Sequence, residues 1–222
     1  MLDPRLSTVL ELIEPCGVLA DIGTDHGYLP LEALTVGKCN FAIAADINSG
    51  PLNRARETFA GSPYLANVEF LLCDGVKEIP NPIDALVIAG MGAETAVMIL
   101  RNDLDRIKTI PQLILQVNKD VDALRRTMTD WGFSIVDERI LFHKHYYVVI
   151  KFAYLQTKPT VSEFEIKYGP VLLKRRDPIF LTYLRSRMHH LEKLALQISN
   201  QTKRHAFENE ALAIRTTLDK ER

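Results

Sequence analysis

Short apolar runs without helical spacing alternate with amphipathic segments through the first half of the chain. The apolar runs predict buried strands at residues 18–20, 41–45, 68–73, 85–89 and 113–118. Around them, apolar residues recur at helical spacing, which predicts helices at residues 5–14, 28–36, 51–59 and 120–131. This alternation is typical of an α/β fold whose strands form a mostly parallel sheet.

The pattern changes after residue 132. Residues 133–141 and 146–154 are rich in β-branched and aromatic side chains, and the short segment between them leaves no room for a crossover helix. They therefore predict an antiparallel hairpin that closes the sheet. Residues 155–161 have the composition of a linker.

Beyond the linker, apolar residues follow helical spacing only. Two long helices that pack as a coiled-coil-like hairpin would bury these stripes, with Asp177 and Pro178 opening the first helix. The two stripes consist of Phe180, Leu184, Met188, Leu191, Leu194 and Ile198, and of Phe207, Ala211, Ile214 and Leu218. The sequence thus predicts an α/β domain at residues 1–157 and a helical domain at 158–222.

The first predicted strand runs into a glycine-containing loop, Val-Leu-Ala-Asp-Ile-Gly-Thr-Asp-His-Gly-Tyr, at residues 18–28. A dinucleotide-binding G-x-G-x-x-G loop would need glycines at positions 21, 23 and 26, and only position 23 has one. The acidic-x-Gly-x-Gly-x-Gly loop of S-adenosylmethionine sites fits better, at Asp21, Gly23 and Gly27, with Asp25 replacing one glycine. Asp21 would face the ammonium of the cofactor's amino-acid end. The alternative interpretation is an ordinary strand-to-helix turn.

Polar residues or glycines also follow the next three strands. Asp46 is predicted to bind the ribose hydroxyls, although it would also suit a helix cap. Asp74 is placed to accept a hydrogen bond from the adenine amino group, although Asp-Gly is also a common turn. The predicted cofactor shell comprises Asp21, Gly23, Thr24, His26, Asp46, Ile47, Asp74, Gly75, Gly90, Met91 and Gly92.

Charge separates the two predicted domains. The whole chain of 222 residues has a formal net charge of −1, with 14 Lys and Arg against 20 Asp and Glu through residue 157, and 13 against 8 beyond it. A basic helical hairpin suggests contact with a polyanion such as an RNA backbone, with Lys174, Arg175 and Arg176 among the candidate residues. The alternative is a solvated helical brace.

Cysteine and histidine positions and the lack of long apolar runs bear on two further questions, metal binding and membrane contact. The three cysteines are far apart in mostly apolar surroundings, and His143 and His145 have no third ligand nearby, so we expect no metal site. No run of eighteen apolar residues and no charged-then-apolar leader is present, so we expect a cytoplasmic protein without membrane contact.

Several motifs together resemble the bacterial tRNA (adenine(22)-N(1))-methyltransferase family. They are Asp-Ile-Gly-Thr-Asp-His-Gly-Tyr-Leu-Pro at 21–30, Ala-Gly-Met-Gly at 89–92, Leu-Gln-x-Asn at 115–118, the Trp-Gly-Phe before the hairpin, and the helical tail. Val117 and Ala93 depart from the usual proline and glycine, which bears on the local shape of the acceptor pocket.

The resemblance implies a Rossmann-like class I methyltransferase that transfers a methyl group from S-adenosylmethionine to N1 of an adenine in tRNA. In that reaction we expect Asp25 to stabilise developing positive charge and Tyr28 to stack on the adenine. Gln116 and Asn118, at the end of the fifth strand, are predicted to contact the substrate. The alternatives are a methyltransferase of this fold with another RNA, a small molecule or a protein as substrate, and a catalytically silent RNA-binding module.

Overall fold

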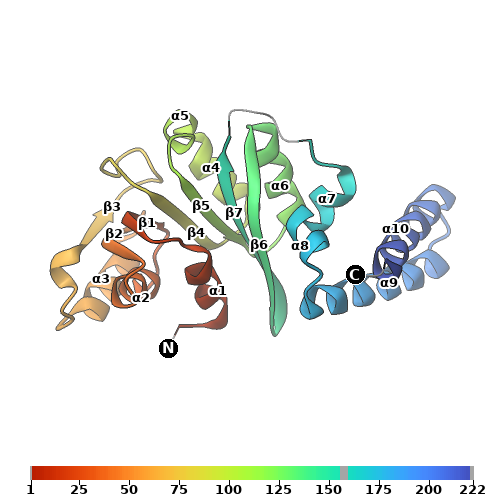
Figure 1. Cartoon of the computed structure of the whole chain (residues 1–222), viewed down its shortest axis with the longest axis horizontal. Coiled ribbons are helices and arrows are strands. Elements are labelled where there is room, and N and C mark those ends of the chain that lie inside the picture. The colour runs from red at the N-terminus through yellow and green to blue at the C-terminus, as the bar shows by residue number, and fades with distance from the viewer. Residues whose placement is uncertain (1, 156–159, 221–222) are drawn as a thin grey trace. The chain divides into compact units, whose positions relative to one another are not determined.

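The computed structural model describes residues 2–155 and 160–220 and contains the predicted sheet. Seven strands lie in the order β3-β2-β1-β4-β5-β7-β6 (Figure 1). The first five are parallel, and the last two form an antiparallel hairpin beside β5. The strands are β1 (Cys16–Ile22), β2 (Cys39–Asp46), β3 (Val68–Leu72), β4 (Ala85–Met91), β5 (Gln112–Val117), β6 (Phe133–His143) and β7 (His145–Tyr154). The predicted α/β fold is confirmed, and the strand order reverses between β1 and β4, where α/β sheets bind ligands.

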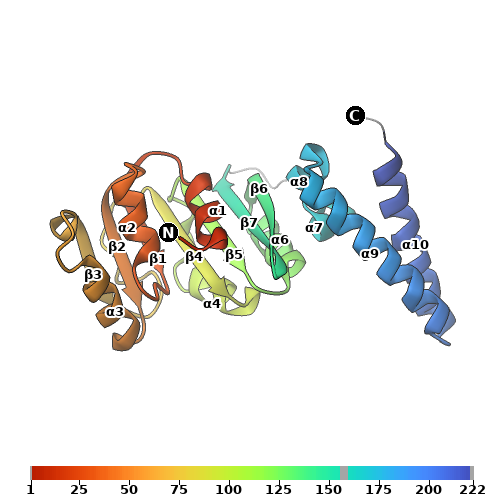
Figure 2. The same cartoon turned by 90° about the horizontal axis from the view of Figure 1, so that it is seen from below.

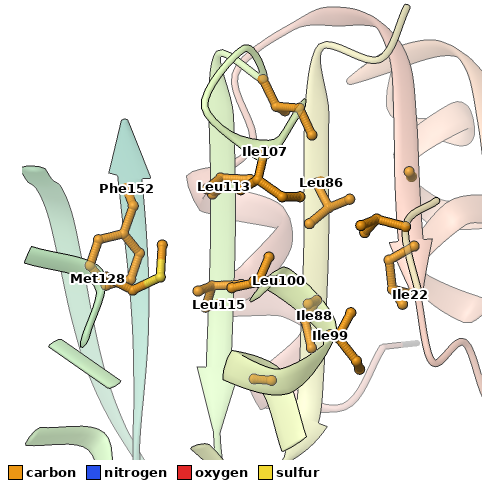
Figure 3. Close-up of a cluster of buried hydrophobic side chains, with 14 of the residues drawn as sticks. Ile22, Leu86, Ile88, Ile99, Leu100, Ile107, Leu113, Leu115, Met128 and Phe152 are labelled. Atoms are coloured by element: carbon orange, nitrogen blue, oxygen red, sulfur yellow. The ribbon is translucent and has the colours of Figure 1, made fainter. Parts of the chain in front are cut away.

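Two layers of helices cover the sheet (Figure 2). Alternate strand residues belong to the cores under the two layers. One face packs against α1 (Pro4–Leu12), α2 (Tyr28–Thr35) and α3 (Ser49–Phe59). The other packs against α4 (Ala93–Arg101), α5 (Leu104–Ile107) and α6 (Val121–Asp130). Figure 3 shows the second core, in which Leu100 lies beside Leu115 of β5 and Met128 lies beside Phe152 of β7. Both cores hold the carboxyl ends of β1, β2 and β4 at one rigid edge.

The hairpin is longer than its pattern predicts. The strands β6 and β7 extend until His143 lies opposite His145, and only Lys144 lies between them. Lys144 has a φ of 62°, the left-handed conformation that so short a turn requires. The histidine pair therefore belongs to the ends of the strands rather than to a separate turn.

Two short helices, α7 (Glu163–Tyr168) and α8 (Pro170–Arg175), follow the hairpin. The chain divides into two compact units between Leu173 and Lys174. The expected boundary between residues 157 and 158 lies outside the described residues. The division falls later because the buried Arg125–Glu138 ion pair binds backbone groups of residues 166–172.

The second unit consists mainly of α9 (Pro178–Gln197) and α10 (Gln201–Asp219), which pack along each other as predicted. Leu184, Leu191 and Ile214 are fully buried between the two helices. Ile198, expected inside the first helix, instead ends it, and the Asn200 side chain caps α10 by accepting from the Lys203 N–H at 3.0 Å. In the described part of the chain, no helix is both long and apolar enough to cross a membrane.

Candidate functional site

The loop after β1 is held by the neighbouring strand. The backbone N–H groups of Gly23 and Thr24 both donate to the Ala45 carbonyl of β2, at 2.8 and 3.0 Å. Gly23 has a φ of +77°, and a Cβ at this position would lie 2.1 Å from the Met91 Cε. The positive φ favours glycine here, and a side chain would also have to displace the end of the Met91 side chain of β4. The two glycine-containing loops are therefore packed against each other at the sheet edge.

Asp21 is the buried acid of this loop, with only 7% of the residue exposed. Burial raises the pKa of its carboxyl to about 6, with the Asp46 carboxylate adding to the effect and the Thr24 hydroxyl opposing it. In the described part of the chain, no lysine, arginine or histidine forms an ion pair with Asp21. A buried carboxylate without a cation is costly for the free protein, so this position suits a ligand that brings its own positive charge.

A cavity of about 320 Å³ opens at this loop. It is lined by Asp3, Arg5, Leu6, Asp21, Gly23, Thr24, Asp25, His26, Gly27, Tyr28, Leu29 and Ala89. The structure thus brings together the loop residues predicted from the sequence. It adds the first turn of α1, which the sequence predicted only as a covering helix.

Asp46 and Asp74 both follow strand ends, as predicted. The Asp46 Oδ1 accepts from the Asn48 backbone N–H at 2.7 Å, which fixes the carboxylate beside the end of β2. Asn48, not Asp46, occupies the cap position of α3. The Cys73 N–H donates to the Asp46 carbonyl at 3.0 Å, and Asp74 is exposed next to it. Both carboxylates therefore lie on the neighbouring strands at the same edge as Asp21.

The carboxyl end of β4 is fixed by the side chains of Gln116 in β5 and of Asn118, which follows β5. The Gly90 N–H donates to the Gln116 Oε1 at 2.9 Å, and the Asn118 Nδ2 donates to the Gly90 carbonyl at 2.7 Å. The Gln116 Nε2 in turn donates to the Asn118 Oδ1 at 3.2 Å. Gln116 is fully buried, so its side chain holds the loop, whereas Asn118 is exposed. The pair Gln116–Asn118, predicted to contact substrate, shapes the wall that substrate would meet.

Arg5 completes this wall. Its Nη1 donates to the same Gln116 Oε1 at 3.3 Å. Gly90 has a φ of +83°, and a Cβ there would lie 2.9 Å from the Arg5 Nη1. Arg5 was not predicted from the sequence, because nothing in the spacing of α1 distinguishes a helix-start arginine that contacts a residue 111 positions away.

The far side of the loop carries Asp25, His26 and Tyr28. The Tyr28 ring is stacked on the His26 imidazole, with ring centroids 5.1 Å apart and planes 5° apart, and Tyr28 is half exposed. Asp25 forms a salt bridge with Arg54 of α3 and lies 3.7 Å from the His26 Nε2. Arg54 was not predicted, and it already supplies Asp25 with a cation.

The basic residues of the second unit differ in what they contact. Lys174 is exposed. Arg176 instead donates to the Thr217 and Leu218 carbonyls, at 2.7 and 3.3 Å, and so binds the end of α10. The hairpin therefore uses Arg176 for its own packing. In the part of the chain that the structure describes, no group of three or more His, Cys, Asp or Glu side chains could hold a metal ion.

Comparisons with known proteins agree with this geometry. The family model described as tRNA (adenine(22)-N(1))-methyltransferase matches residues 19–221. The Bacillus subtilis tRNA (adenine(22)-N(1))-methyltransferase is 31% identical over 89% of this chain and 86% of the relative.

Two solved structures were obtained with the cofactor or its product. M. capricolum TrmK in complex with S-adenosyl-homocysteine is 31% identical, with a TM-score of 0.84, over 99% of this chain and 98% of that one. A Streptococcus pneumoniae protein in complex with S-adenosyl-L-methionine is 27% identical, with a TM-score of 0.86, over 98% of this chain and all of that one. The chain belongs to the tRNA (adenine(22)-N(1))-methyltransferase family.

Proposed function

We propose that the cavity at residues 21–28 is the place where this tRNA (adenine(22)-N(1))-methyltransferase holds S-adenosylmethionine. The observation that carries the assignment is Asp21, a buried carboxylate with no cationic partner in the described part of the chain. The cofactor's amino-acid end supplies the missing ammonium, and a charge-assisted hydrogen bond to it would keep Asp21 ionised. Bound there, the cofactor provides an electrophilic methyl group on its sulfonium.

The other predicted contacts follow from the sheet edge. Gly23 allows the backbone to approach the cofactor closely, because glycine adopts its φ of +77° without strain and has no side chain to stand between. Asp46, fixed by the Asn48 N–H, is assigned to the ribose hydroxyls. Asp74 is assigned to the adenine amino group. These three roles are inferred from strand position and charge.

The acceptor adenine needs to be positioned more than activated. Its N1 carries an in-plane lone pair and is uncharged at neutral pH, so it attacks the methyl group without a general base. N1 lies on the pairing edge, so the base has to leave its stack before it can enter the site. We assign the half-exposed Tyr28 ring, already stacked on His26, to receive it.

Asp25 is assigned to the charge that develops on the adenine ring. Methyl transfer leaves a positive charge there until an N6 proton is lost, and a carboxylate nearby lowers the energy of that state. Arg54 competes for the same carboxylate. We therefore expect Arg54→Ala to alter the transfer rate, and not only the protein's stability, if Asp25 acts in this step.

Incubation with radiolabelled S-adenosylmethionine and bulk bacterial tRNA, followed by mapping of the modified nucleosides, tests the function. The expected product is 1-methyladenosine at position 22. The matched variant is Asp21→Asn, which keeps the shape of the side chain and removes its charge; it should lose most of its activity at limiting cofactor. Label in another nucleoside, or in protein or small molecules only, would contradict the proposal.

We further propose that the second unit contributes affinity for the tRNA backbone, and that the protein acts in the cytoplasm with its substrate. Several basic side chains on the helical hairpin are exposed: Lys174, Arg185, Lys193 and Lys203. Each phosphate contact releases counterions, so the logarithm of the binding constant should fall with log salt by roughly 0.7–0.9 per contact. Replacing these four residues by alanine should make that slope shallower without changing cofactor binding. An unchanged salt dependence of tRNA binding would mean that the second unit has a structural role only.

A further inference from the structure

A second cavity, of about 350 Å³, lies beside the cofactor cavity and shares Asp3 and Arg5 with it. Its lining comes from the start of α1, the end of β5 and the tip of the β6–β7 hairpin. The residues are Asp3, Arg5, Asn118, His143, His145, Tyr146 and Tyr147. None of the hairpin residues has a role in the site described above.

The strand pattern explains why these side chains converge. The cross-strand pairs Leu141–Tyr147 and His143–His145 follow each other with period two, so their four side chains share one face of the hairpin. Leu141 and Tyr147 pack into the core under α1. The two histidines continue that face past the core, to the point where α1 begins.

The lining has the chemistry of a nucleotide site. The two exposed imidazoles of His143 and His145 offer planes for stacking on a base, and the Arg5 guanidinium offers donors to a phosphate. The Asp3 carboxylate is occupied locally: its Oδ1 accepts from the Arg5 N–H at 2.6 Å, and its Oδ2 lies 3.6 Å from the Arg5 Nη2. Next to the cavity, Phe142 is 59% exposed and contacts Tyr146 with ring centroids 4.9 Å apart. The hairpin tip therefore interleaves aromatic and basic residues, Phe142 to Tyr146.

We propose that this cavity binds the base of a tRNA nucleotide directly next to the methylated adenine. The inference rests on the proposed function, because an adenine that leaves its stack to enter the first cavity brings its covalently linked neighbours to the rim. Arg5 lines both cavities, so it lies where the phosphate joining the two nucleotides would pass. Arg5 also contacts Gln116, which holds Gly90. Occupation of the second cavity would thus be coupled to the wall of the first.

A double-mutant cycle on binding tests the proposal. The protein variant is His143→Ala with His145→Ala; both side chains are exposed, and the described structure gives them no packing role in the core. The RNA variants are tRNA transcripts with an abasic nucleotide on the 5′ or the 3′ side of the target adenine. Affinities are measured by filter binding with S-adenosyl-homocysteine present, so methyl transfer is not needed for the readout.

For the wild-type protein, one of the two abasic transcripts should bind about tenfold more weakly, as expected for one stacked base. The histidine variant should bind the normal transcript about tenfold more weakly and lose nothing further with that abasic transcript. Lys77→Ala, an exposed basic residue that follows β3, is the control and should retain the full effect of the missing base.

Equal losses from each abasic transcript in the wild-type and histidine-variant proteins would overturn the second site. Calorimetry of S-adenosyl-homocysteine binding confirms that the variant's first cavity is intact. The outcomes for the two proposals are separate. Failure to form 1-methyladenosine in normal tRNA would overturn the proposed function. If the effects of the histidine substitutions and of the missing base simply add, only the proposed second cavity site is overturned.

Discussion

Two buried carboxylates in the same sheet have opposite surroundings. Glu138 of β6 is fully buried, and its Oε1 accepts from the Arg125 Nε at 2.7 Å, while its Oε2 accepts from the Val171 N–H at 3.0 Å. Burial raises the pKa of Glu138, but Arg125 and these backbone amides oppose the effect. Asp21 is almost as buried, and burial raises its pKa to about 6, but among the described residues no cation forms an ion pair with it.

Glu138 carries a charge that stabilises the fold, whereas we assign Asp21 a charge that binds a ligand. Glu138 and Arg125 satisfy each other and also bind residues 166–172, so their charges join the end of the sheet to α7 and α8. Under the proposed function, the charge of Asp21 is met by the ammonium of the bound cofactor. A protein tolerates such a cost at a binding site, because the ligand removes it.

The largest expected effect comes from breaking the satisfied pair. Arg125→Met leaves Glu138 buried without its cation and should lower the free energy of unfolding by roughly 3–5 kcal/mol. Chemical denaturation measures it. The neighbouring Arg126 makes a similar pair with Glu163, but both side chains are largely exposed, so Arg126→Met is the matched control and should change stability little. Equal effects of the two substitutions would mean that burial does not distinguish the pairs.

Removing the charge of Asp21 should change the free energy of unfolding in the opposite direction. The pKa of Asp21 is higher in the folded protein than the ordinary value of 3.8 for an aspartate, so its contribution to stability decreases as pH rises from about 4 to about 6. At neutral pH, Asp21→Asn should therefore raise the free energy of unfolding of the cofactor-free protein by roughly 1–3 kcal/mol. Denaturation at pH 4 and pH 7.5 checks this, because the difference between the two proteins should shrink at the lower pH. A destabilised Asn variant at pH 7.5 would contradict the interpretation.

An effect of similar size is expected on cofactor binding at Asp46. If its carboxylate accepts from the ribose hydroxyls, Asp46→Ala should weaken S-adenosyl-homocysteine binding by about 1.5–3 kcal/mol, as for a lost charge-assisted hydrogen bond. Isothermal calorimetry measures the change. Because Asp46 also accepts from the Asn48 N–H, Asp46→Asn serves as control: it keeps an acceptor for that turn but removes the charge. If both variants bind the cofactor as tightly as the wild type, Asp46 does not bind the ribose hydroxyls.

The smallest effects on stability and cofactor affinity are expected at Tyr28. Its ring is half exposed and stacks on His26, so Tyr28→Ala should leave cofactor affinity and stability nearly unchanged. Transfer to tRNA in single-turnover experiments should slow by an amount equivalent to about 1–3 kcal/mol of lost stacking. Tyr28→Phe keeps the ring and should transfer normally. A normal rate for Tyr28→Ala would show that the adenine stacks elsewhere.

The features predicted from sequence are those encoded by local patterns. Continuous apolar runs specify strands such as 113–118, and the order of Asp21, Gly23 and Gly27 specifies the loop, because periodicity and backbone conformation act over a few residues. The short helices α4 and α5 were not assigned, although α4 starts directly after the predicted glycine loop.

The features that sequence did not predict are contacts between distant segments. Arg5 meets Gln116, Arg54 meets Asp25, and Arg125 reaches the carbonyls of residues 166 and 167. A single sequence does not show which arginine on a helix surface pairs with which polar group on another element. The same limit applies to Arg176, predicted to contact RNA, whose guanidinium binds the end of α10.

The central claim is that the Asp21 carboxylate pairs with the ammonium of the cofactor. The number of protons released on cofactor binding tests it most directly. Calorimetry of S-adenosyl-homocysteine binding at pH 6, in buffers of different ionisation enthalpy, measures protons released per cofactor bound. With a pKa of about 6, Asp21 is about half protonated in the free protein, and pairing with an ammonium ionises it. The account predicts release of about half a proton by the wild type at pH 6, little release from this group at pH 8, and none attributable to it in Asp21→Asn. A count at pH 6 that is the same in both proteins would contradict it.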